Sequence, residues 1–279
     1  MSIFQILLPA FVASLILTGI HAYLGVHVVE RGVIFVDLSL AQIAALGSTV
    51  AYLAGYDVHS STAYVFSLGF TFLGAAIFAF SRTHRKTRIP QEAIIGIVYA
   101  VSAAIAILVM SKATQETEHL KEMLVGNILS VSWKELAKTA ILYSLVGVFH
   151  YVFRRRFLTI SMNEPEAMRF GWNIRFWDFL FYMSFGFVVT SSVAIAGVLL
   201  VFCFLIVPAV TAMLFSERLG PRLAIGWTMG AIVSAGGVAL SFLLDLPTGA
   251  TIVGTFGVAL LILAGVRLLI GKRVSNSTA

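Results

Sequence analysis

The sequence is poor in charged residues. Of its 279 residues, 11% are Asp, Glu, Lys or Arg, whereas 59% belong to the hydrophobic set. A soluble domain of ordinary composition has roughly 45–50% apolar and about 25% charged residues, so this chain has too few polar side chains to cover a soluble surface. The composition argues against a soluble enzyme or binding domain and predicts a polytopic membrane protein.

Cysteine is almost absent. Because Cys203 is the single cysteine, no disulfide can form within the chain. It lies in the apolar run 198–208, where we expect a packing residue, so it indicates no redox compartment. The first 20 residues lack the basic start and the cleavage site of a signal peptide, and we interpret them as part of the first membrane span.

Motifs for nucleotide binding and hydrolysis are absent as well. The sequence contains no G-x-x-x-x-G-K-[ST], H-E-x-x-H, G-x-S-x-G or C-x-x-C pattern. We therefore predict a chain that is not an enzyme, with no catalytic residues and no intrinsic cofactor, so that any ATP would be hydrolysed by a separate subunit. An intramembrane enzyme is the least supported hypothesis, because the sequence offers no pairing of a nucleophile with a base.

Long apolar segments make up most of the sequence. A spanning helix needs about 20 mostly apolar residues, because no backbone polar group can stay unpaired in hydrocarbon. The predicted spans are residues 3–29, 33–54, 61–81, 92–111, 136–153, 175–193, 195–215, 223–243 and 250–271. This pattern predicts an all-α membrane bundle of about nine transmembrane helices, or eight if residues 190–197 do not separate two spans. No linker divides the chain, so residues 1–279 are predicted to form a single membrane domain.

Basic residues lie mainly in alternate loops. They are densest at residues 82–88 and 154–156, whereas the loops between hold only Lys112, Lys121 and, near the next span, Lys134 and Lys138. Cytoplasmic loops carry the excess of Lys and Arg, so the C-terminus is predicted to be cytoplasmic and, with nine spans, the N-terminus to lie outside. The net charge of +6 is thus explained by membrane topology, and no nucleic-acid partner is expected.

Residues 163–171, "NEPEAMRFG", have the pattern of a short helix between two spans. Asn163 suits the N-cap, Pro165 the first turn and Glu166 the capping-box position. Gly171 can end the helix in the left-handed conformation. The alternative is an ordinary surface loop.

The outer segment, about residues 112–135, also contains a helix signal. Ser132 and Glu135 in "SWKE" form a capping-box pattern that leads into the next span. His119 lies near three carboxylates, those of Glu116, Glu118 and Glu122. We interpret this group as a solvated helix face rather than as a metal site.

Several polar side chains lie at membrane depth. Ionisable residues there usually face the bundle interior or a water-filled pathway. The candidates for a substrate pathway are Asp37, Ser39, Gln42, His21 and Asp245. The alternatives are interhelical hydrogen bonds for Gln42, a place near the headgroups for Asp37, and a capping role at the final helix for Asp245.

Six segments, in the same order, resemble the permease subunits of bacterial zinc, manganese and iron ABC importers, which are relatives of the cobalamin and siderophore permeases. They are residues 25–37, 91–100, 124–136, 163–171, 197–219 and 245–253. The resemblance covers some 230 residues and implies the type II ABC importer fold.

The resemblance implies partners and roles. The residues Asn163, Glu164, Glu166, Ala167 and Gly171 would belong to a cytoplasmic coupling helix that fits a groove on an ABC ATPase subunit, and changing Glu166 or Gly171 would uncouple transport. The outer loops would dock an extracytoplasmic substrate-binding protein. Two copies of the permease would enclose the pathway as a homodimer in the lipid bilayer of the bacterial cytoplasmic membrane.

The sequence departs from this family at the expected metal site. The family form has an Asp and a His four residues apart, followed five residues later by a Gly. Alignment on Gly47 places Leu38 at the Asp position and Gln42 at the His position, with Asp37 one residue early. Imidazole suits zinc and manganese better than a carboxamide oxygen does.

Divalent metal ions, zinc, manganese or iron, are the leading substrate by resemblance, with Asp37 and Gln42 as candidate ligands. One alternative is the same importer carrying a metal chelate or another small solute. The other is a proton-coupled secondary transporter that uses Asp37 as its proton carrier.

Overall fold

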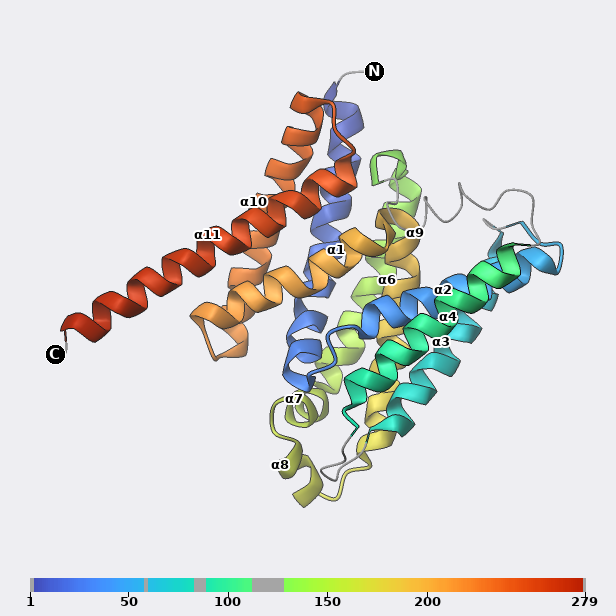
Figure 1. The fold of residues 1–279 in the computed structure, drawn as a ribbon, viewed down its shortest axis with the longest axis horizontal. Coiled ribbons are helices and arrows are strands. Elements are labelled where there is room, and N and C mark those ends of the chain that lie inside the picture. The colour runs from blue at the N-terminus through green and yellow to red at the C-terminus, as the bar shows by residue number, and fades with distance from the viewer. Residues whose placement is uncertain (1–2, 58–59, 83–88, 112–127, 278–279) are drawn as a thin grey trace. The chain divides into compact units, whose positions relative to one another are not determined.

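A computed structural model describes residues 3–57, 60–82, 89–111 and 128–277. Within these residues every regular element is a helix, as the sequence predicts (Figure 1). The elements are α1 (Ile3–Arg31), α2 (Val36–Leu53), α3 (Ser61–Ser81), α4 (Gln91–Met110), η1 (Ile128–Ser130), α6 (Trp133–Val152), α7 (Arg154–Met162), α8 (Glu164–Arg169), α9 (Ile174–Phe215), α10 (Leu219–Leu244) and α11 (Thr248–Ser277). The predictions for His119 and its neighbouring glutamates lie outside the described residues.

Most of these helices can cross a membrane. Among the described residues, seven helices are long and apolar enough, and eight if α6 and α7, which are bent by 76°, form one broken span. The sequence predicts nine because it divides the region of α9 into two spans. At 1.5 Å per residue, the 42 residues of α9 would extend about 63 Å, roughly twice the hydrocarbon thickness of a bilayer.

The helix α9 has a break inside it. Gly197 has a φ of 75° and a ψ of 162°, which is not helical and which side chains with a Cβ rarely adopt. The break lies at the end of residues 190–197, where the sequence predicts a turn or an interruption. The long apolar region therefore consists of two helical segments that meet at Gly197.

The chain divides into two compact units built from alternating segments. One unit comprises Met1–Val29, Asn127–Ala140 and Leu199–Ala279, and the other comprises Glu30–Gly126 and Ile141–Val198. Each unit therefore draws on distant parts of the chain. That residues 1–279 act as one permease domain remains a prediction.

The first unit contains α1 up to Val29, η1, the start of α6, the second part of α9, and the hairpin of α10 and α11, while the last two residues of α1 belong to the second unit. Helices α1 and α9 pack closely, because the backbone at Gly25 lies against the carbonyl of Leu205. The Trp227 indole N–H on α10 donates to the Gly19 carbonyl on α1 over 2.9 Å. Small residues and side chain–backbone bonds of this kind stabilise helix pairs in membranes, where helices gain little from apolar burial.

The α10–α11 turn corrects one expectation from the sequence. Asp245 ends α10 in the left-handed conformation, with φ 52° and ψ 46°, and its side chain is exposed. It therefore terminates the preceding helix rather than capping the final one. The hydroxyl of Ser241 instead fastens the turn, because it donates to the Leu246 carbonyl at 2.7 Å and lies 2.6 Å from the Thr248 hydroxyl.

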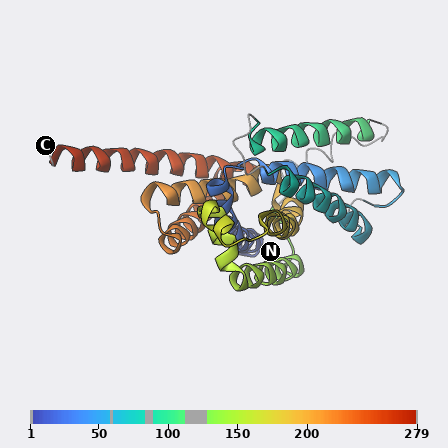
Figure 2. The ribbon, with the colours of Figure 1, turned by 90° about the horizontal axis from the view of Figure 1, so that it is seen from below.

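The second unit contains α2, α3 and α4, the end of α6, helices α7 and α8, and the first part of α9. Helix α2 packs against both α3 and α4 (Figure 2). The aromatic core of this unit centres on α9, where Phe181, Tyr182 and Phe185 are fully buried. Tyr143 of α6 reaches the same helix through the hydroxyl of Ser192, 2.6 Å away.

The start of α6 confirms the capping box predicted at residues 132–135. The backbone N–H of Ser132 donates to Glu135 Oε2 at 2.8 Å, and the backbone N–H of Glu135 donates to Ser132 Oγ at 3.2 Å. Two N–H groups that lack partners within the helix are thereby satisfied.

Candidate functional site

The short helix α8 begins as the sequence predicts. Asn163 is its N-cap: the Glu166 backbone N–H donates to Asn163 Oδ1 at 3.4 Å, and Asn163 Nδ2 donates to Glu166 Oε2 at 2.8 Å. Pro165 lies in the first turn, where its missing N–H leaves no intrahelical bond unmade. A six-residue helix is too short to be stable alone, so these contacts help to hold it.

The end of α8 is also fixed. Gly171 has a φ of 67°, as the sequence predicts for a left-handed terminus. Its N–H donates to the Met168 carbonyl at 2.9 Å, and the N–H of Trp172 donates to the Ala167 carbonyl at 3.4 Å. This pair of bonds is the Schellman motif. Hydrogen bonds thus define both ends of α8.

One side of α8 is open to solvent. Ala167 is fully buried, whereas Met168 on α8 and Phe170, the residue that follows α8, are 42% and 46% exposed. The guanidinium of Arg155 lies 5.3 Å from the centroid of the Phe170 ring, and Phe170 stacks on Trp172. Exposed apolar side chains bordered by positive charge are typical of a surface that binds another protein.

Four charged side chains form a cluster that begins at Glu164 in the first turn of α8 and extends into the protein interior. Arg31 Nη1 lies 2.7 Å from Asp178 Oδ1, and Arg82 Nη1 lies 2.8 Å from Asp178 Oδ2. Arg82 Nη2 lies 2.8 Å from Glu164 Oε2. Positive and negative charges balance within the cluster. Arginine suits this arrangement because its planar guanidinium can bind two carboxylates at once.

Sequence reasoning missed most of this cluster. It used basic residues, among them Arg82 in the run 82–88, only to orient the chain, and it assigned no functional role to Arg31 or Asp178. One signal was available: Asp178 is the only acidic residue in the 42 residues of α9. An acidic residue in an apolar helix is expected to have a charged partner.

Arg82, just beyond the end of α3, keeps its positive charge. Burial acts to lower the pKa of Arg82, but the negative charges of Asp178 and Glu164 and the hydrogen bonds to them outweigh burial. The pKa of this guanidinium is therefore raised above its ordinary value. Arg82 remains protonated at every pH at which a cell lives.

A second polar group lies at the start of α2. Asp37 is 2% exposed and Ser39 is fully buried, whereas Gln42 is half-buried. Asp37 Oδ1 and Ser39 Oγ have no hydrogen-bond partner among the described residues. Buried polar atoms are nearly always paired, so such atoms mark places where a water, an ion or a solute can bind.

Glu92, which sequence reasoning did not single out, extends this group. It lies in the first turn of α4, and its Oε1 accepts a hydrogen bond of 3.0 Å from the backbone N–H of Phe35, the N-cap of α2. Its other oxygen, Oε2, is buried and has no partner among the described residues. Phe35 precedes Asp37 by two residues, so this hydrogen bond places Glu92 at the first turn of α2, which carries Asp37. The starts of α2 and α4 thus bring two carboxyl groups together.

The other two pathway candidates belong to the other compact unit. His21 and Asp245 belong to the first unit, whereas Asp37, Ser39 and Gln42 belong to the second. His21 is fully buried on α1, and its Nδ1 is 2.7 Å from the Leu17 carbonyl of the same helix. In the part of the chain that the structure describes, no three His, Cys, Asp or Glu side chains are grouped so that they could hold a metal ion.

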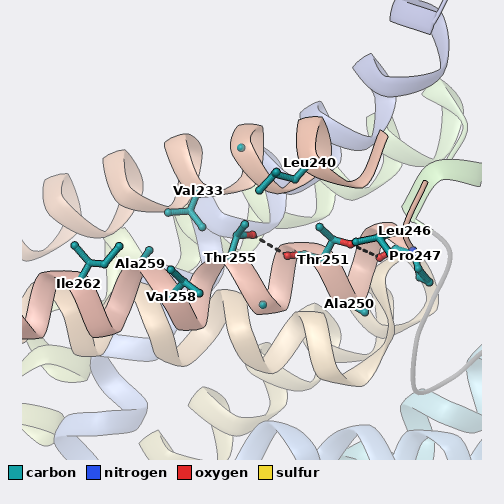
Figure 3. Close-up of a pocket in the computed structure, with 12 residues that line it drawn as sticks. Val233, Leu240, Leu246, Pro247, Ala250, Thr251, Thr255, Val258, Ala259 and Ile262 are labelled. Atoms are coloured by element: carbon teal, nitrogen blue, oxygen red, sulfur yellow. Dashed lines mark hydrogen bonds between the residues drawn. The ribbon is translucent and has the colours of Figure 1, made fainter. Parts of the chain in front are cut away.

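The first unit has a groove of about 630 Å³ along α10 and α11 (Figure 3). Its lining is almost entirely apolar, and its two threonines are bonded to their own helix. Thr251 Oγ1 donates to the Pro247 carbonyl, and Thr255 Oγ1 donates to the Thr251 carbonyl, each at 2.9 Å. The groove therefore offers little that would bind a charged solute, and it suits hydrocarbon better.

The sequence as a whole matches a known family. The family model described as "ABC 3 transport family" matches residues 3–267. The manganese transport system membrane protein MntC of Listeria innocua is 27% identical over 244 residues, covering 88% of this chain and 84% of that protein. The chelated iron transport system membrane protein YfeC of Yersinia pestis is 26% identical over 250 residues, covering 90% and 82%.

Solved structures share the fold. PsaBC from Streptococcus pneumoniae, solved in complex with Fab, matches with a TM-score of 0.76 at 24% identity, covering 94% of this chain and 91% of that one. An inward-facing conformation of a metal-chelate type ABC transporter matches with a TM-score of 0.70 at 19% identity, covering 92% and 85%. These two matches bear out the predicted type II importer fold.

Proposed function

We propose, since the chain belongs to the ABC 3 transport family, that this multi-pass membrane permease carries divalent metal ions into the cell as part of an ATP-driven importer. The observation that carries the proposal is the family match along nearly the whole chain. Manganese or iron is the substrate that the relatives' names favour, and zinc is the third candidate by resemblance.

The geometry of α8 supports a partner ATPase. A short helix that is capped at both ends and exposes Met168 and Phe170 is suited to enter a groove on another subunit. Asn163, Glu164, Glu166, Ala167 and Gly171 would then form the coupling helix. The ATPase would bind and hydrolyse ATP, and the permease itself would need no cofactor.

The polar group at the start of α2 supports a role in the substrate pathway. Carboxylate oxygens are good ligands for manganese and iron, and Asp37 and Glu92 each have one buried oxygen without a partner among the described residues. Asp37, Ser39 and Gln42 would line the route of the ion, and Glu92 would add a second carboxylate. His21 and Asp245 would contribute only where the first unit borders the same route.

The other partners follow from the family. A substrate-binding protein would deliver the ion at the outer face, and a second copy of the permease would complete the pathway. The chain would lie in the bacterial cytoplasmic membrane with its C-terminus in the cytoplasm, as the distribution of basic residues predicts.

A metal chelate is the second candidate substrate. Gln42 replaces the expected histidine, and the described residues contain no group of three His, Cys, Asp or Glu for a bare ion. A chelate arrives with its own ligands and needs fewer from the protein. One matching structure is of a metal-chelate type transporter, although that likeness extends only to the fold.

The proposal is tested by the metal content of starved cells. Cells that express this chain with its ATPase and binding protein should accumulate manganese or iron, measured by elemental mass spectrometry. The variants Asp37→Asn and Gln42→Ala should reduce accumulation at least tenfold, because each removes a group proposed to line the pathway. Glu217→Gln, at an exposed position, is the matched control and should transport like the wild type.

Two results would count against the proposal. If no metal accumulates while the assembled complex hydrolyses ATP, the substrate is not a free divalent ion, and uptake of chelated iron becomes the next assay. If the metal accumulates equally in the Asp37 and Gln42 variants, the site assignment on α2 is wrong, although the transport function stands.

A further inference from the structure

Helix α8 is held by side chains from helices that are distant in the sequence. Arg31 at the end of α1 is separated from Ser161 by 130 positions, and Arg82 at the end of α3 is separated from Glu164 by 82. Arg31 Nε donates to Ser161 Oγ, at the end of α7, over 2.8 Å. Arg82 Nη2 donates to Glu164 Oε2, in the first turn of α8, also over 2.8 Å. The segment that leads into α8 is therefore fastened to both α1 and α3.

Asp178 joins these two attachments. Its Oδ1 accepts from Arg31 Nη1 at 2.7 Å and from Arg82 Nη1 at 2.9 Å, and its Oδ2 accepts from Arg82 Nη1 at 2.8 Å. The side chain of Arg31 also lies over the Phe181 ring, 3.9 Å from its centroid. The Asp178 carboxylate on α9 thus connects the ends of α1 and α3, and Arg82 also binds Glu164 in α8.

The cluster runs from the interior to the surface. The side chains of Asp178 and Arg31 are 0% and 1% exposed, that of Arg82 is 10% exposed, and that of Glu164 is 31% exposed. Ion pairs shielded from water are stronger and less screened by salt than exposed ones. A displacement of Glu164 would therefore move Arg82 and then Asp178 and Arg31, because the ion pairs become stronger as the side chains become less exposed.

Helices α1 and α3, which the cluster joins, are both connected to α2 and its polar group. Helix α1 continues into α2 through only four residues, 32–35. Helix α3 packs tightly on α2, because a Cβ placed at Gly47 would lie 2.7 Å from the Phe66 carbonyl oxygen. A movement of the ends of α1 and α3 must therefore also displace α2, which carries Asp37, Ser39 and Gln42.

We propose that the cluster Arg31–Asp178–Arg82–Glu164 transmits the movement of α8 to α2, with Arg82 as the positioning residue that joins the surface to the interior. This inference rests on the proposed function, in which an ATPase moves α8. The inference adds that the covalent connection from α8 to α9 is not sufficient to transmit the movement of α8 to the pathway. Side-chain contacts with the ends of α1 and α3 are also required.

The test uses two variants that keep Asp178 paired. Arg82→Lys retains a positive charge beside Asp178, but a single ammonium group cannot reproduce the fork that binds Asp178 and Glu164 together. Glu164→Gln removes only the outer charge. Arg175→Gln is the matched control, because it removes an exposed positive charge from α9 three residues before Asp178.

The readout is a distance between two copies of the permease in the complete complex with its ATPase. A spin label is placed at Met162, at the end of α7 directly before α8, or at Leu53 at the end of α2, which are 41% and 51% exposed. Cys203→Ala removes the native thiol from every sample. Double electron–electron resonance then measures the label-to-label distance without nucleotide and after trapping with ATP and vanadate.

In the wild type and in Arg175→Gln, both distances should change on ATP trapping. In Arg82→Lys and Glu164→Gln, the change at Met162 should remain, while the change at Leu53 should fall to less than half. Uptake of radioactive Mn²⁺ per ATP hydrolysed should fall at least tenfold in the same variants. If the cluster only stabilised the fold, the variants would lower the yield of the complex or its ATP hydrolysis, and the ATP-dependent changes of the two distances would stay alike.

The outcomes distinguish the inference from the function on which it rests. If the wild type shows no change at Met162, no ATPase acts on α8, and the proposed function and the inference both fail. If the wild type responds and the two variants show the full change at Leu53, the inference is overturned while the proposed function stands.

Discussion

At the scale of single residues, Asp178 is closely constrained by its partners. It is fully buried and accepts hydrogen bonds from two arginines. Bringing these charges out of water is unfavourable, and the cluster is stable only because each charge faces an opposite one. The pairing of the arginines therefore depends on this one carboxylate more than on the outer Glu164.

Asp178→Asn should destabilise the protein strongly. The neutral amide leaves two buried positive charges without their main partner, and breaking a buried ion pair in this way costs about 3–5 kcal/mol. The thermal unfolding midpoint of the purified chain in detergent should fall clearly. Glu217→Gln, an exposed change of the same charge, should leave the midpoint within error. An unchanged midpoint in Asp178→Asn would show that the arginines find other partners.

At the scale of elements, the contact of α2 with α3 depends on small residues. The backbones approach so closely at Gly47 that an added Cβ would also lie 2.9 Å from Ser67 Cα. Backbone atoms cannot rotate away as the tip of a side chain can. The helix that carries the polar group is thereby held at a fixed distance from α3.

Gly47→Ala should separate α2 from α3 and destabilise the second unit by about 1–3 kcal/mol, as overpacking in a tight core does. Gly69→Ala is the matched control on α3, because a Cβ there meets nothing within 4 Å, and the alanine should be neutral or slightly stabilising. Thermal unfolding in detergent compares the two. Equal stability of both variants would mean that the helices shift apart without loss.

At the scale of the whole molecule, the energy source decides between an ATP-driven importer and a proton-coupled carrier. The sequence has no nucleotide-binding motif, and α8 has an exposed surface for a partner. The purified chain alone in liposomes should therefore take up no Mn²⁺ under an imposed pH gradient. Together with its ATPase and binding protein, it should take up Mn²⁺ only when ATP is supplied. Uptake by the chain alone, abolished by Asp37→Asn, would instead support a carrier in which Asp37 moves protons.

The sequence by itself determined the features that depend on local patterns. Apolar runs predicted the helices, because a chain in hydrocarbon must satisfy its backbone internally. Asn163 and Gly171 predicted both ends of α8, and Ser132 predicted the start of α6, because helix caps bond within a few residues. The family resemblance was visible for the same reason, since its segments follow one another in order.

Only the tertiary structure decided which distant residues meet. The contacts of Arg82 with Asp178 and Glu164 span 96 and 82 positions, and that of Glu92 with Phe35 spans 57, so no local pattern could reveal them. Which helix Asp245 belongs to was not decided by the sequence either, because its neighbours allow either a helix start or a helix end, and the structure places it at the end of α10. An ion pair or a close packing contact depends on where the folded helices bring side chains together, and that is a property of the fold rather than of any single segment.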